Sequence, residues 1–94
     1  MNRTTKTNII NFLNHEDKHA NIDNTYSSHE LLALFIYTLN YNVLDCYNWF
    51  DLMEYSQEEL LEDMDSKTRE AYNLLDGSSC DEKVFQKIIE EYVK

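Results

Sequence analysis

The chain has 94 residues, enough for one domain with a single modest core and too few for two. It contains one glycine and no proline, residues that tight hairpins need, so an all-β fold is disfavoured. Eight Lys and Arg against eighteen Asp and Glu give a formal net charge of -10, which disfavours binding to nucleic acid or to a membrane and favours a basic protein as partner. We therefore predict an all-α fold, a single bundle of four to five helices over residues 1–94.

The first predicted helix spans about Thr5 to His15, where apolar residues recur at helical spacing. Residues 14–27, rich in Asn, His and small polar side chains, form the one predicted long loop. Three later segments begin with a Ser that is followed three residues on by a Glu, the capping box that satisfies N–H groups at the start of a helix. These pairs are Ser27 with Glu30, Ser56 with Glu59, and Ser79 with Glu82.

The helix that begins at Ser27 is apolar on most of its circumference, so we expect it to be the central element of the bundle. The helix from Ser56 is predicted to end at Gly77, because glycine takes the left-handed conformation after a helix without steric cost. A further helix is predicted between Asn40 and Tyr55, where apolar residues again recur at intervals of three and four. They are Val43, Cys46, Tyr47, Phe50 and Met53.

Residues 15–19 read His-Glu-Asp-Lys-His and match the letters of the zinc motif H-E-x-x-H. In zinc peptidases the interior of this motif is largely apolar because the helix that carries it is buried, whereas here Asp17 and Lys18 are charged. No predicted strand offers an edge to a substrate, and no rigid element places a third ligand. We therefore interpret the string as a solvated helix end, with zinc binding by His15 and His19 at most adventitious, and predict no enzyme, no metal and no cofactor.

The two cysteines, Cys46 and Cys80, lie 34 residues apart and form no C-x-x-C motif, so neither a zinc knuckle nor a redox pair is indicated. Two free thiols are typical of a reducing compartment. The apolar residues near the N-terminus are too few for a signal peptide, and no stretch approaches the length of a membrane span. A cytoplasmic location is therefore expected.

An acidic stretch from residue 45 to residue 65 holds eight Asp and Glu and neither Lys nor Arg, so most of the net charge is local. Two parallel rows of carboxylates are predicted on one helix, Glu58, Glu62 and Asp65 beside Glu59 and Asp63. Their spacing is of the order of the distance between phosphates of a nucleic-acid strand, which indicates a surface that fits a cationic groove. The alternative interpretation is a solvated acidic face without a partner.

Aromatic residues cluster around the first half of this acidic stretch. Tyr47 and Phe50 belong on the predicted apolar stripe, whereas Tyr41, Trp49 and Tyr55 are not readily placed inside. Tyr and Trp often anchor protein interfaces, so these three are candidate contact residues, although a helical core can also absorb several tyrosines. The predicted partner-binding residues are Tyr41, Asp45, Trp49, Asp51, Glu54, Tyr55, Glu58, Glu59, Glu62, Asp63 and Asp65.

A small acidic helical domain without a catalytic motif is predicted to be an inhibitor that binds a basic nucleic-acid-handling enzyme or nuclease and blocks its groove. In charge, size and helicity the chain resembles the DNA-mimic proteins that phages use against restriction or CRISPR enzymes; the resemblance covers no motif and implies no residue roles. One alternative is an immunity protein for a nuclease toxin, similar to the acidic helical inhibitors of colicin nucleases. Another is a helical adaptor or regulator without an inhibitory role. The predicted oligomeric state is a monomer or a homodimer.

Overall fold

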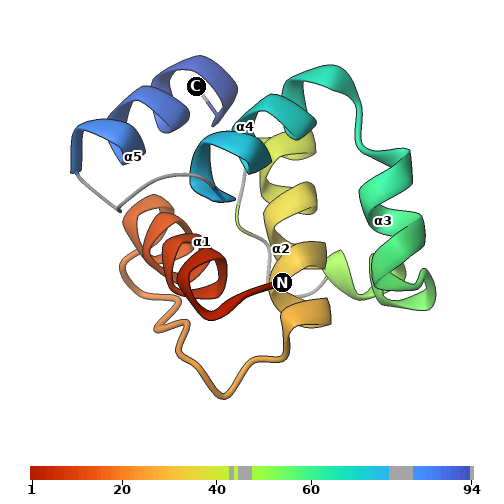
Figure 1. The fold of residues 1–94 in the computed structure, drawn as a ribbon. Helices are drawn as coiled ribbons and strands as arrows, with labels where there is room; N and C mark the ends of the chain where they lie inside the picture. Colours follow the sequence, from red (N-terminus) through yellow and green to blue (C-terminus); the bar gives the residue numbers. More distant parts are fainter. Residues whose placement is uncertain (43, 45–47, 77–81, 94) are drawn as a thin grey trace.

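A computed structural model describes residues 1–42, 44, 48–76 and 82–93 of the chain (Figure 1). The helices, in chain order, are α1 (Arg3–Glu16), α2 (Ser28–Tyr41), the 3₁₀ helix η1 (Trp49–Glu54), α3 (Gln57–Asp63), α4 (Ser66–Asp76), α5 (Glu82–Ile88) and the π-helix η2 (Ile89–Val93). No strand occurs within the described ranges, so the all-α prediction is confirmed. The predicted number of four to five helices is slightly low.

Helix α2 is the central element of the bundle. Its predicted capping box is formed, because Ser27 Oγ accepts from the N–H of Glu30 at 3.1 Å and the Glu30 carboxylate accepts from the N–H of Ser27 at 3.0 Å. Eight of its side chains are buried. Helices α1, η1, α3, α4 and η2 all pack against it, and Figure 1 shows it in the middle of the fold. The prediction of a central helix is confirmed.

Helix α1 contacts α2 through aromatic rings and α4 through a polar side chain. The rings of Phe12 and Phe35 meet edge to face with centroids 5.5 Å apart, a favourable geometry for aromatic pairs. At the contact with α4, the buried Asn8 donates through Nδ2 to the carbonyl oxygen of Leu75 at 2.6 Å. Because the last carbonyls of a helix lack donors within that helix, Asn8 satisfies one of them at the end of α4.

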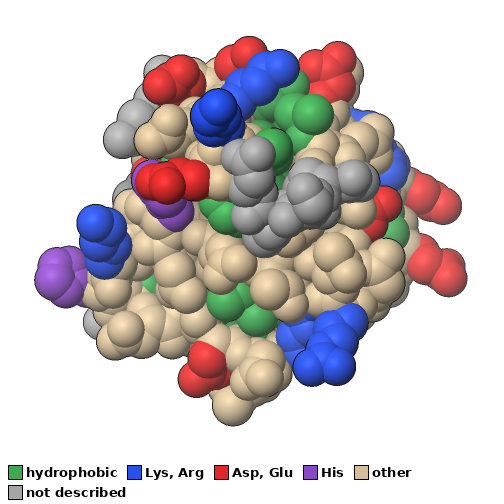
Figure 2. Space-filling view, turned by 60° about the vertical axis from the view of Figure 1, so that its left-hand side comes forward, with side chains coloured by type: hydrophobic (Ala, Val, Ile, Leu, Met, Phe, Trp, Pro, Cys, Tyr) green, Lys and Arg blue, Asp and Glu red, His purple; other side chains and the backbone are tan. Residues whose placement is uncertain are grey.

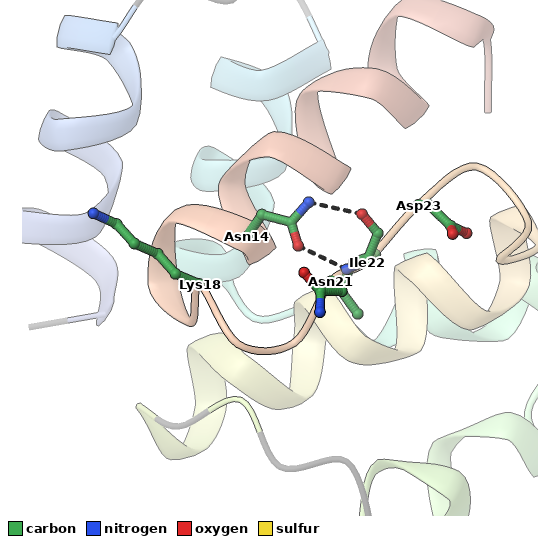
Figure 3. A pocket seen from close by; sticks show the side chains of 5 residues that line it. All are labelled: Asn14, Lys18, Asn21, Ile22 and Asp23. Atoms are coloured by element: carbon green, nitrogen blue, oxygen red, sulfur yellow. Dashed lines mark hydrogen bonds between the residues drawn. The ribbon is translucent and has the colours of Figure 1, made fainter.

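The loop that follows α1 is held by a side-chain amide (Figure 3). Asn14 donates through Nδ2 to the carbonyl oxygen of Ile22 and accepts through Oδ1 from the N–H of Ile22, both at 2.7 Å. This pairing keeps the side chain of Ile22 in the core, and Asn21 before it takes a left-handed φ of 51°. The loop starts later than the predicted range 14–27, because α1 continues to Glu16. The residues around the pair line an open depression on the surface.

The helix predicted from Ser56 onwards is interrupted by Met64 and Asp65, which separate α3 from α4. The backbone of Met64 leaves the helical region with a ψ of 128°. Asp65 Oδ1 accepts the N–H of Thr68 at 2.7 Å, the interaction of a residue that caps the start of a helix. The prediction of one continuous helix is therefore wrong, and the additional break raises the number of helices.

Between Asn40 and Tyr55 the structure describes the short 3₁₀ helix η1 in place of the predicted α-helix. Among the described helices, none combines the length and the apolar character that crossing a bilayer requires. Some of the residues that carry predictions lie outside the described ranges. They are Val43, Asp45, Cys46, Tyr47, Gly77, Ser79 and Cys80.

Candidate functional site

Most of the predicted contact residues belong to one part of the molecule, formed by η1 and α3 and called here the acidic arm (Trp49–Asp63). Figure 1 shows α3 on the side of α2 that is remote from α1 and α5. The structure describes every residue of the arm, and two of them, Trp49 and Leu60, are buried in the core cluster. Arg69 of α4 also holds the arm by donating to the carbonyl oxygen of Leu61. The arm thus lies on α2 with few core side chains and exposes most of its residues.

Further polar contacts fix the backbone where η1 passes into α3. His29 donates through Nε2 to the carbonyl oxygen of Tyr55 at 2.5 Å and ties the end of η1 to the start of α2. Ser56 and Glu59 form the second predicted capping box, with distances of 3.1 Å from the N–H of Glu59 to Ser56 Oγ and 3.2 Å from the N–H of Ser56 to the Glu59 carboxylate. The start of α3 is therefore held both by its own cap and by α2.

Five carboxylates of the acidic arm are exposed to solvent. Within the described residues, no Lys or Arg forms an ion pair with any of them, and none accepts a hydrogen bond. Near the top of the face that Figure 2 brings forward, by contrast, Lys or Arg side chains lie beside Asp or Glu side chains. The carboxylates of the arm are therefore free to meet an external cation. They are Asp51, Glu54, Glu58, Glu62 and Asp63.

Two carboxylates from the predicted rows have internal partners instead. Glu59 accepts from the N–H of Ser56 and caps α3. Asp65 lies beyond the end of α3 and caps α4, and the hydrogen bond from the backbone N–H of Thr68 lowers the pKa of its carboxyl group. The predicted row of Glu58, Glu62 and Asp65 is therefore wrong in its last member, because the helix that was to carry it ends at Asp63.

Trp49 and Phe50 occupy the opposite environments from those predicted. Trp49 is 4% exposed and belongs to the core, whereas Phe50 is 56% exposed and stacks on Trp49 with ring centroids 4.3 Å apart. The prediction assumed α-helical spacing, but η1 is a 3₁₀ helix that starts at Trp49 and packs against α2. The change of spacing places Trp49 inside and leaves Phe50 as the exposed aromatic residue.

Tyr55 and Tyr41 are both exposed, at 46% and 63%, but they belong to different surfaces. The Tyr41 ring packs against Tyr37, one turn earlier on α2, with centroids 4.5 Å apart. The neighbouring pair on α2, Ile36 and Asn40, lines a pocket together with Tyr55. Because consecutive helix residues point about 100° apart, Tyr41 is turned away from this pocket.

This pocket, called here the α2–α3 pocket, has a volume of about 220 Å³ and lies between α2, η1 and α3. Four of its seven lining side chains are apolar, and Tyr55, Asp63 and Asn40 supply its polar groups. The sequence contained a partial signal for it. Ile36 and Asn40 are four residues apart on one predicted helix, and Leu60 and Met64 are four residues apart on another, so each pair lies on one helical face. The four apolar residues are Ile36, Leu52, Leu60 and Met64.

The histidines of the zinc-like string do not share a helical face. Helix α1 ends at Glu16, so His15 lies in its last turn and His19 lies beyond it, where its N–H donates to Asp17 Oδ1 at 2.9 Å. The zinc motif requires both imidazoles one turn apart on a single helix. In the part of the chain that the structure describes, no group of three or more His, Cys, Asp or Glu is arranged to hold a metal ion.

Comparison with protein-family models, with curated proteins and with solved structures gives no match. The function is therefore inferred from the surface of the chain itself. Two features distinguish the acidic arm from the rest of the described surface. One is its run of exposed carboxylates with no Lys or Arg between residues 49 and 63, and the other is the adjoining α2–α3 pocket, whose lining includes the exposed Asp63.

Proposed function

We propose that the chain binds a basic, nucleic-acid-handling protein through the acidic arm and blocks the groove in which that protein holds nucleic acid. The observation that carries this proposal is the set of five exposed carboxylates on one arm, none paired with a described Lys or Arg. A surface that serves folding and solubility alone would mix both signs of charge. An excess of one sign, held on a fixed backbone, favours a partner of the opposite sign.

The electrostatics of α3 support this role. Glu58 and Glu62 lie one turn apart on the helix, so their carboxylates repel each other and cost a few tenths of a kcal/mol. A cationic partner relieves this repulsion, and the summed field of the arm accelerates its approach. Both effects weaken as salt is added, because exposed charges are screened over about 10 Å at 0.1 M salt. Binding through the arm should therefore be strongly salt-sensitive.

The size of α3 limits what the arm can imitate. Its seven residues span about 10 Å, and one DNA strand presents a phosphate about every 3.4 Å along the helix axis. The helix therefore covers about the length of three phosphates. This dimension favours competition for a local cationic site within a groove over imitation of a long duplex.

A helical adaptor without inhibitory role is the second candidate, and the α2–α3 pocket favours it. Imitation of phosphate groups needs charge and spacing, whereas an apolar pocket beside the exposed rings of Phe50 and Tyr55 is typical of a protein-protein interface. The two candidates share a basic partner and differ in whether nucleic acid is displaced from it.

Affinity capture with the wild-type chain, at low and at high salt, tests the proposal. The captured protein is identified, purified and mixed with labelled nucleic acid, and fluorescence anisotropy follows the bound fraction as the chain is added. We expect a protein with net positive charge, loss of capture at high salt, and release of the nucleic acid. A captured protein that is not basic, or that keeps its nucleic acid, contradicts the inhibitor role.

A matched pair of variants separates the arm from the overall charge. The first variant carries Glu58→Gln, Glu62→Gln and Asp63→Asn and should lose most of the binding. The control removes three exposed carboxylates elsewhere, so both variants raise the formal net charge of -10 by the same three units. Equal losses of binding in the two variants would show that charge alone, and no particular surface, drives association. The control substitutions are Glu82→Gln, Glu90→Gln and Glu91→Gln.

A further inference from the structure

We propose that the α2–α3 pocket receives an arginine side chain of the partner. This inference rests on the proposed function for the partner's basic character, and it adds which side chain enters and where. The pocket volume of about 220 Å³ lies below the range of about 300–1,000 Å³ that is typical of small-molecule sites. One side chain inserted from a facing protein surface is an occupant of suitable size.

The walls of the pocket fit the aliphatic part of such a side chain. Leu60 and Met64 lie on α3 and its end, and Ile36 and Leu52 line the pocket from α2 and η1. Arginine and lysine place their methylene groups on apolar surface while the charged group stays near water. The insertion would remove apolar surface of both proteins from water without burying a full charge.

The polar groups of the pocket select a cation at its mouth. The carboxylate of Asp63 is exposed, and within the described residues it has no ion-pair partner. An apolar side chain in this place would cover a carboxylate without replacing its lost hydration, which is unfavourable. A cationic side chain supplies a charge-assisted hydrogen bond instead.

Arginine fits these groups better than lysine. A planar guanidinium can bind a carboxylate through two parallel hydrogen bonds, and it stacks on aromatic rings. Tyr55 provides a partly exposed ring in the pocket that holds Asp63, and the side chain of Asn40 adds a further hydrogen-bond acceptor. The weaker hydration of guanidinium also lowers the cost of entering a partly apolar site.

The surrounding charge favours the same occupant. Glu59 lies one turn before Asp63 on α3, and Glu58 and Glu62 lie on the adjacent row. None of these carboxylates lines the pocket, so they add a negative field without adding contacts. A guanidinium at Asp63 therefore sits at the edge of the most acidic part of the arm.

Methyl NMR spectroscopy with capped single amino acids tests the proposal directly. The probes are N-acetyl-arginine methylamide and its lysine, citrulline and norleucine counterparts, at matched chloride concentration. We expect saturable shifts of the methyl signals of Ile36, Leu52, Leu60 and Met64 with arginine, with a dissociation constant on the order of 1 mM for so small a contact. Lysine should bind several-fold more weakly. Citrulline, which has nearly the shape of arginine without its charge, and norleucine should leave these signals unchanged.

Two pairs of variants locate the contact. Asp63→Asn should weaken arginine binding about tenfold, whereas Glu62→Gln, the same change of charge one residue away and outside the pocket, should leave it within about twofold. Tyr55→Leu should weaken it about two- to fivefold through loss of the aromatic face, and Tyr41→Leu should have no effect. All four side chains are exposed, so circular dichroism should show the folded chain in each variant.

Two results would overturn the proposal. One is equal binding of citrulline or norleucine and arginine, which assigns the pocket to apolar groups. The other is equal weakening by Asp63→Asn and Glu62→Gln, which assigns the effect to diffuse charge. Failure of the proposed function is distinct from both, since arginine could then still shift the pocket signals while the three substitutions on the arm leave protein capture unchanged.

Discussion

Two sides of this molecule use their polar side chains in different ways. On the side of α1 and α4, Thr5 donates to the carboxylate of Asp76, and Asn8 and Asn14 donate their amide hydrogens to backbone carbonyls. On the acidic arm, five carboxylates face solvent without a described partner. Polar groups in the first set stabilise the fold, and those in the second cost a little stability through repulsion. The contrast separates the structural part of the chain from the part that is available to a partner.

The burial of apolar side chains divides the molecule along the same line. Helix α2 buries seven apolar side chains, whereas η1 and α3 each bury one, Trp49 and Leu60. Since apolar burial is the main stabilising contribution to folding, the bundle around α2 should determine global stability. The arm depends on this bundle and contributes less to it. Paired substitutions, one on each side, can break or sharpen this division.

The largest expected difference is between two phenylalanines. Phe35 is fully buried on α2, and Phe35→Ala should cost about 3–5 kcal/mol of unfolding free energy because a cavity remains. Phe50 is exposed on η1, and Phe50→Ala should cost about 0.5–1 kcal/mol, mainly through its lost stacking on Trp49. Urea denaturation followed by circular dichroism measures both. Similar losses of unfolding free energy would show that the arm contributes as much to global stability as α2 does.

The side-chain amide that holds the loop should give the next largest effect. Asn14→Ala removes two hydrogen bonds to Ile22, each 2.7 Å long, and should cost about 1–3 kcal/mol. Asn14→Asp should cost at least as much, because a carboxylate oxygen then faces the carbonyl oxygen of Ile22. Asn73→Ala, at an exposed position of α4, is the control and should be nearly neutral in the same denaturation experiment.

The sequence predicted the parts of the fold that short-range rules determine. The capping boxes at Ser27 and Ser56 are both formed, because a Ser and a Glu three residues apart can satisfy each other's backbone N–H groups in any context. The apolar run of α2 likewise identified the central helix, since a helix that is apolar on most of its circumference must be covered by other elements on most of its sides.

The errors of prediction arose where one residue type has two uses. The prediction assigned Asp65 to a charged row. An Asp can also cap the start of a helix by accepting the N–H of the residue three positions later, and Asp65 does so with Thr68. Trp49 and Phe50 were assigned by α-helical spacing, which the 3₁₀ geometry of η1 changes. The α2–α3 pocket had only a partial signal in the sequence, the spacing of its residues within single helices, because no local pattern specifies how the three elements that line it pack together.

The two capping boxes offer a third comparison with identical chemistry in different places. Ser27→Ala and Ser56→Ala each remove an acceptor 3.1 Å from the N–H of the third helical residue, a change that costs about 1 kcal/mol at a typical helix start. Because α2 carries the core, Ser27→Ala should lower the global unfolding free energy by about this amount. Ser56→Ala should instead accelerate amide hydrogen exchange within α3, with a smaller global effect. Equal global losses would contradict the division between bundle and arm.

The smallest predicted effect concerns acid, and it tests whether a carboxylate that caps a helix differs from one that faces a partner. The backbone hydrogen bond from Thr68 lowers the pKa of Asp65 in the folded chain below its usual value of about 3.9. The folded state therefore binds its proton less readily than the unfolded chain. The resulting stabilisation is complete above the unfolded pKa and is lost as the pH falls through the folded pKa.

Asp65→Asn should remove part of this acid sensitivity, because asparagine still caps α4 through its side-chain oxygen but carries no titrating proton. The unfolding free energy of the variant, measured with urea from pH about 6 to about 2, should fall less steeply below pH about 4 than that of the wild-type chain. Asp63→Asn is the matched control, since it removes a carboxylate that accepts no hydrogen bond from the described residues. Two results would contradict this expectation: a steeper fall of the unfolding free energy with acid in Asp65→Asn, or an equally reduced fall in Asp63→Asn. Either would show that the capping hydrogen bond does not set Asp65 apart from the carboxylates of the arm.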